Sequence, residues 1–177
     1  MDLSSISISI SYSIERFQHQ TCSFASTENL HSTKVKEMAS ETICHEISHQ
    51  WFGDTVTETW WDDLFLSEGF ATLFETVSQK MALPEQVDYL EGKFLVNTMQ
   101  AALTADTNIT YSHPLYDIDD ITYKKGGSIL RMIETVLGKS VFQSALQSYI
   151  RTYQFSSADH EMLFEKFTEV LLRQLTL

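Results

Sequence analysis

Hydrophobic side chains recur at three- and four-residue intervals over most of this chain, which is the period of an α-helix. The first such stretch predicts a helix over 33–52 that Gly53 ends, with apolar positions at Val35, Met38, Ala39, Ile43 and Ile47. Residues 55–61 then suggest an extended or looped return. The same periodicity predicts five further helices, over 62–81, 84–105, 121–137, 140–153 and 157–172.

Polar residues and glycine mark the expected helix ends. Asp62 or Asp63 is a suitable N-cap for the second helix, and Pro84 is suited to the first turn of the third. Residues 106–121 form a polar loop with three aspartates near its end, Asp117, Asp119 and Asp120. Their spacing is not that of an EF-hand, so we expect them to cap the next helix rather than bind calcium. Gly138 is expected to end that helix.

The first 28 residues differ from the rest of the chain. Serine and isoleucine alternate strictly over 5–14, which is the period of a half-buried strand. This stretch has no basic flank and no unbroken apolar core, so it does not resemble a signal peptide. We expect residues 1–28 to be a leader with at most a short strand, and residues 29–177 to form one mainly α-helical domain.

Composition narrows the choice of partners. The 177 residues carry a net charge of −12, which repels phosphate backbones and argues against a nucleic-acid partner. No apolar run approaches the roughly 18 residues needed to span a bilayer. Two cysteines, Cys22 and Cys44, are too few for a disulfide scaffold, and we expect Cys44 to be a small core residue. Compartment and oligomeric state are left open by these patterns.

The most informative segment is His45-Glu46-Ile47-Ser48-His49. On a helix, residues four apart lie about 40° from each other and one turn along the axis, so both imidazoles leave the same face. Two imidazoles in this arrangement can hold one metal ion. Glu46 lies beside that face, where a carboxylate can reach water bound to the metal.

A catalytic zinc site needs a third protein ligand, often a carboxylate. Glu68 follows His49 after 18 intervening residues, and a turn through Gly53 would fold its helix back against the first. Thr72 and Glu75 share the helix face of Glu68, where they either hydrogen-bond the imidazoles or lie on a solvated surface. The four other histidines have no partner at ligand spacing and are expected at the surface or in loops: His19, His31, His113 and His160.

The ligand count alone leaves an iron site open as well. A glutamate placed as a base favours hydrolysis by one zinc ion. A metzincin site fits less well, because Phe52 and Thr55 stand where that class needs glycine and histidine.

These residues resemble the zinc signature of the gluzincin aminopeptidases, the family of alanyl aminopeptidase and leukotriene-A4 hydrolase. Further segments carry the resemblance: Gln50-Trp51-Phe52-Gly53, Trp60-Trp61-Asp62-Asp63-Leu64, Glu68-Gly69-Phe70-Ala71, Ser112-His113-Pro114 and Ile121-Thr122-Tyr123-x-Lys125-Gly126. The resemblance implies the helical part of a thermolysin-like catalytic domain over 29–177. It implies zinc ligands and catalytic residues as follows: His45, His49 and Glu68 bind one zinc ion, Glu46 is the general base, and Tyr123 donates a hydrogen bond to the oxyanion. Relatives in this family are cytosolic or anchored to membranes as ectoenzymes.

The chain also departs from the family pattern. It contains no Gly-Ala-Met-Glu-Asn segment, whose glutamate binds the free amino group of the substrate in the family. Ser67 replaces the usual asparagine before the third ligand, and Phe65 replaces a usual tryptophan. Flanking domains of the family are absent too, so the chain resembles a partial catalytic domain.

Two functions follow. The first is a zinc aminopeptidase that removes N-terminal residues from peptides with free N-termini. The alternative is a catalytically impaired, zinc-binding fragment or isoform of such an enzyme.

Overall fold

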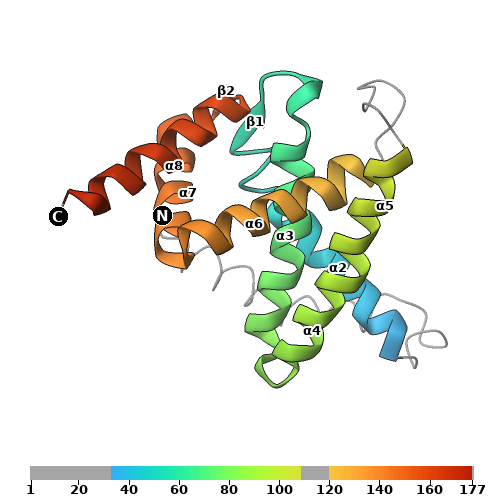
Figure 1. The fold of residues 1–177 in the computed structure, drawn as a ribbon. Coiled ribbons are helices and arrows are strands. Elements are labelled where there is room, and N and C mark those ends of the chain that lie inside the picture. The colour runs from blue at the N-terminus through green and yellow to red at the C-terminus, as the bar shows by residue number, and fades with distance from the viewer. Residues whose placement is uncertain (1–32, 109–119, 177) are drawn as a thin grey trace.

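The computed structural model describes residues 33–108 and 120–176. Its longer helices are α2 (Thr33–Ser48), α3 (Phe65–Ala82), α4 (Val87–Lys93), α5 (Gln100–Asn108), α6 (Gly126–Leu137), α7 (Lys139–Tyr153) and α8 (His160–Leu175). Two short strands, β1 (Val56–Glu58) and β2 (Ser156–Ala158), complete the regular structure together with brief 3₁₀ and π turns. The predicted mainly α fold class is confirmed (Figure 1). The leader, with its possible strand, and the loop residues 109–119 lie outside the described residues.

Helix α3 is the central element, because it packs against both α2 and α6 (Figure 1). Its residue Phe70 is fully buried and stacks on Phe52, with ring centroids 4.2 Å apart. Phe74, one turn further along α3, also stacks on Phe52 at 5.5 Å. Cys44 of α2 is fully buried in the same core, as expected. This aromatic contact holds the end of α2 against the first half of α3.

A close backbone contact joins α3 to α6. A Cβ atom added to Gly69 would lie 2.9 Å from the carbonyl carbon of Gly126, and one added to Gly126 would lie 3.2 Å from the Cα of Gly69. Side chains at these two positions would therefore force the helices apart. The π-helical turn Ile121–Lys125 directly precedes α6, so this contact also brings that turn toward α3.

The two strands join distant parts of the chain. β1 pairs in parallel with β2, with Val56 opposite Ser156 and Glu58 opposite Ala158. The extended return after Gly53 was expected, but β2 was not: the helix predicted over 157–172 begins only at His160. Asp159 is its N-cap, and its side chain accepts a hydrogen bond from the backbone N–H of Met162 at 2.9 Å.

The predicted caps at Asp62 and Asp63 are wrong. Both lie in a 3₁₀ turn, Trp61–Asp63, and α3 begins after Leu64 without a side-chain cap. The Asp63 carboxylate instead pairs with Nδ1 of His160 at 2.7 Å, which links this turn to α8. His160 is half exposed, as expected of a surface residue, but it has a partner that local spacing could not predict.

Two other predicted helices also have different bounds, and one further expected cap is not formed. α2 ends at Ser48, four residues before the predicted end. A tight turn follows, in which Gly53 has a φ of +128°. The helix predicted over 84–105 is a 3₁₀ turn at Pro84–Gln86, then α4, a π turn at Phe94–Met99 and α5, which extends to Asn108. Asp120 does not cap with its side chain, which pairs with Lys124 at 2.9 Å. Within the described residues, no helix is long and apolar enough to cross a bilayer.

We predict that Gly69→Ala destabilises the fold by about 1–3 kcal/mol, because overpacking at a backbone contact displaces both helices. Gly92→Ala is the matched control: a Cβ there meets nothing within 4 Å, so alanine should raise stability by about 0.5–1 kcal/mol. Urea unfolding followed by circular dichroism measures both changes. Equal stability of the two variants would contradict the close contact of α3 and α6.

Candidate metal centre

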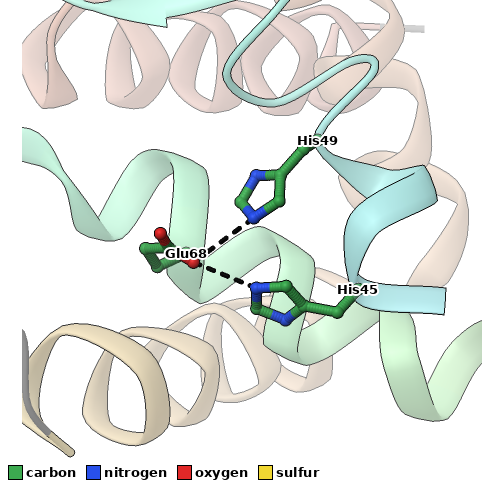
Figure 2. Close-up of side chains that lie close together, drawn as sticks. All are labelled: His45, His49 and Glu68. Carbon is green, nitrogen blue, oxygen red and sulfur yellow. Dashed lines mark hydrogen bonds and ion pairs between the residues drawn. The ribbon is translucent and has the colours of Figure 1, made fainter. Parts of the chain in front are cut away.

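Three side chains converge on one point. His45 projects from the last turn of α2, His49 from the turn directly after that helix, and Glu68 from the first turn of α3 (Figure 2). Oε2 of Glu68 lies 3.0 Å from Nε2 of His45 and 3.3 Å from Nε2 of His49. The α2–turn–α3 arrangement thus brings the three predicted ligands together.

The donor set fits a zinc ion. One ligand atom from each of His45, His49 and Glu68 lies within 4.8 Å of the others. Ligand atoms around a tetrahedral ion with bonds of about 2.0–2.1 Å lie about 3.3 Å apart, close to the two contacts of Glu68. Two imidazoles and a carboxylate are ligands that zinc prefers, and three protein ligands leave a fourth position open.

The second nitrogen of each imidazole has its own partner. Nδ1 of His45 lies 2.6 Å from Oε1 of Glu75, and Nδ1 of His49 donates to the backbone carbonyl of Phe52 at 3.0 Å. A hydrogen bond at Nδ1 keeps the proton there and leaves the lone pair of Nε2 for a metal. Both rings are therefore oriented for coordination through Nε2.

The electrostatics of the cluster keep Glu68 ionised and favour protonated imidazoles. Burial alone would lower the pKa of His45, but Glu68 and Glu75 outweigh it and raise the pKa to about 9. The hydrogen bond with Glu68 raises the pKa of His49 as well. Burial favours neutral Glu68, but both imidazoles overcome this and lower its pKa to about 2. Without a metal ion, protons bound to the imidazoles thus supply the positive charge that balances Glu68.

The two expected catalytic residues are next to the proposed ligands, one in the sequence and one in space. Glu46 is solvent-exposed on α2, between the two histidines. Tyr123 lies in the π-helical turn before α6, and its ring stacks on His45 with centroids 5.8 Å apart. Burial, followed by the charge of Glu68, raises the pKa of Tyr123 to about 12. The Tyr123 hydroxyl therefore stays protonated at neutral pH and is available as a hydrogen-bond donor.

Thr72 and Glu75 have different surroundings. Of the two alternatives predicted for Glu75, a hydrogen bond to an imidazole or a solvated surface, the structure has the hydrogen bond, made to His45. Thr72 is buried, and its side chain lies against α6: a Cβ atom added to Gly127 would be 3.2 Å from the Cβ of Thr72. Among the contacts of the described residues, none joins Thr72 to an imidazole, and its role beside the imidazoles stays a prediction.

Ser67 is a neighbour of the cluster that stood out in the sequence only because it replaces the asparagine usual in the family. Its hydroxyl donates to the Phe52 carbonyl at 2.9 Å and lies 3.3 Å from Nδ1 of His49. No spacing rule could have revealed this contact, because it depends on the shape of the turn between α2 and β1. The only signal in the sequence was that Ser67 directly precedes Glu68.

Comparison with known proteins agrees with the geometry. The profile described as "Peptidase family M1 domain" matches residues 16–176, nearly the whole chain, and the chain belongs to this family. The Caenorhabditis elegans protein named "Putative aminopeptidase-2" is 45% identical over 143 residues, which cover 78% of this chain and 8% of the relative. "Probable aminopeptidase 1" of Sulfurisphaera tokodaii is 38% identical over 148 residues, or 78% of this chain and 19% of that protein.

Mouse "Aminopeptidase N" is 34% identical over 157 residues, which cover 81% of this chain and 16% of the mouse protein. The chain thus spans less than a fifth of the length of these three relatives. The expected family is confirmed. The boundary drawn at residue 28 stays a prediction.

We predict that Glu75→Gln lowers the pKa of His45 in the metal-free protein by about 1 unit, because a neutral amide replaces the carboxylate at Nδ1. Thr72→Val is the control from the same helix face and should leave this pKa unchanged. Titration of the His45 ring protons by NMR measures both effects. An unchanged pKa in Glu75→Gln would mean that the contact between Glu75 and His45 is absent in solution.

We also predict that zinc uptake at pH 7 releases protons. A liganding imidazole must be neutral, whereas the pKa of His45 is about 9 and that of His49 is raised. Apparent affinity should therefore rise between pH 6 and 8, by about tenfold per pH unit for each imidazole that loses a proton. Titration calorimetry in two buffers of different ionisation enthalpy measures the release. Binding enthalpies that do not depend on the buffer would refute it.

Proposed function

We propose that this chain carries the zinc-binding catalytic centre of a metallopeptidase that removes N-terminal residues from peptides. The observation that carries the proposal is the convergence of two imidazoles and one carboxylate beside an exposed glutamate. Membership of peptidase family M1 and relatives with aminopeptidase names support it. Peptides are the proposed substrate class, and the second test below asks whether a free N-terminus is required.

The proposed zinc ligands are His45, His49 and Glu68. A zinc ion held by them would supply Lewis acidity toward the scissile carbonyl and would lower the pKa of water at the site. The carboxylate of Glu68, with its pKa of about 2, is ionised at neutral pH and contributes a negative charge to the ligand set. Glu75 and the Phe52 carbonyl keep the two rings oriented through their Nδ1 contacts.

Glu46 is the proposed general base. It lies on α2 next to His45, and its side chain is exposed to solvent. In this role it removes a proton from the attacking water and later delivers that proton to the leaving amine. Such proton transfer typically contributes about 10²–10⁴-fold to a rate.

Tyr123 is the proposed oxyanion donor. Its ring stacks on His45 and its pKa of about 12 keeps the hydroxyl protonated. A donor held next to the reacting carbonyl stabilises the negative charge that develops there, and removal of such a donor costs about 10²–10³-fold in kcat.

The first test separates chemistry from metal binding. Glu46→Gln should lower hydrolysis of an aminoacyl fluorogenic amide by at least about 100-fold while zinc content is unchanged, because Glu46 is not a ligand. Glu165→Gln, at an exposed position of α8, is the matched control and should keep full activity. Activity of Glu46→Gln equal to that of the control would remove Glu46 from the mechanism.

The second test concerns the amino terminus of the substrate. Because the sequence lacks the Gly-Ala-Met-Glu-Asn segment, we predict slow hydrolysis with weak discrimination between free and N-acetylated substrates. The assay compares matched pairs of free and acetylated amides on the unaltered chain. Brisk turnover confined to free N-termini would show that another carboxylate of this chain binds the ammonium group.

A further inference from the structure

One backbone carbonyl between the second and third proposed ligands accepts two hydrogen bonds. The carbonyl of Phe52 receives Nδ1–H of His49 at 3.0 Å and the hydroxyl of Ser67 at 2.9 Å. The Ser67 oxygen also lies 3.3 Å from Nδ1 of His49. These three groups form a closed triangle, which we name the Phe52 clamp: His49 Nδ1, Phe52 O and Ser67 Oγ.

The Phe52 clamp lies in a buried and tightly packed part of the turn. Ser67 is 6% exposed and Phe52 is 2% exposed, so water does not compete freely for their polar atoms. A Cβ added to Gly53 would lie 2.7 Å from Ser67 Oγ and 3.5 Å from His49 Nδ1. Space for the Ser67 hydroxyl therefore exists only because residue 53 has no side chain.

The clamp also connects the two elements that carry the ligands. His49 belongs to the turn that ends α2, whereas Ser67 directly precedes Glu68 on α3. Because Ser67 holds the carbonyl that orients His49, the position of His49 is tied to the helix turn that presents Glu68. No second hydroxyl among the described residues contacts this carbonyl or either imidazole.

We propose that Ser67 is a positioning residue of the metal centre: its hydroxyl holds the Phe52 carbonyl against Nδ1 of His49 and so keeps Nε2 of that ring directed at Glu68. The inference rests on the proposed function, since it assigns the hydroxyl to a zinc site. Partners of this kind that orient liganding histidines typically contribute 10–100-fold to metal affinity.

Ser67→Ala removes the hydroxyl but leaves the turn and Gly53 unchanged. We expect it to weaken zinc binding by about tenfold, measured by competition with a chromophoric chelator. Ser78→Ala is a closely matched control. Ser78 is also buried on α3, but its hydroxyl has no hydrogen-bond partner among the described residues, so its loss should leave zinc affinity unchanged.

Two further measurements separate positioning from a general loss of structure. In the zinc-loaded protein, the Nδ1 proton of His49 should exchange with solvent faster in Ser67→Ala than in the unaltered chain, as followed by NMR. Ser67→Asn, which restores a side-chain donor and is the residue usual in the resembled family, should recover most of the lost affinity.

Zinc affinity of Ser67→Ala equal to that of the unaltered chain would overturn the inference and leave the proposed function standing. An equal loss in Ser78→Ala would also overturn it, because any buried hydroxyl of α3 would then have the same effect. Failure of the unaltered chain to bind zinc would refute the proposed function together with the inference.

Discussion

Everything in this site depends on one contact: the carboxylate of Glu68 lies between the imidazoles of His45 and His49. Each imidazole attracts the carboxylate in these partly buried surroundings, and together they overcome the effect of burial and lower the pKa of Glu68 to about 2. The contact requires α3 to return closely against the end of α2. The turn at Gly53, the stacking of Phe52 on Phe70 and the close contact of Gly69 with Gly126 together hold α3 in that place.

The packing of α3 against α6 also positions Tyr123, which is not one of the proposed ligands. Because α6 contacts α3 through glycines, the π-helical turn before α6 comes near the cluster, and Tyr123 stacks on His45. π turns often occur at functional sites, where an extra residue in a helix turn redirects a side chain. The geometry of the site thus follows from helix packing, and the chemistry follows from which side chains that packing exposes.

The hydrophobic pattern and residue spacing predicted the features that depend on residues close together in the sequence. His45 and His49 share a helix face because of their four-residue spacing, and Glu68 reaches them because a helix returns after Gly53. Tyr123 could be named only from the family resemblance, since nothing in its neighbours distinguishes it from six other tyrosines. β2 and the pair of Asp63 with His160 were missed, because residues separated by about a hundred positions meet through the tertiary fold alone. The clamp at Ser67 was missed for a related reason: it depends on the path of a turn, which hydrophobic periodicity does not encode.

We propose that His45, His49 and Glu68 form one zinc site. It is tested most directly by the metal content of the purified chain, measured by mass spectrometry beside that of His49→Ala. Loss of one of three protein ligands should abolish tight binding, because two ligands hold zinc weakly. We predict about one zinc ion per unaltered chain and almost none in the variant. Equal zinc content in the two proteins would contradict it.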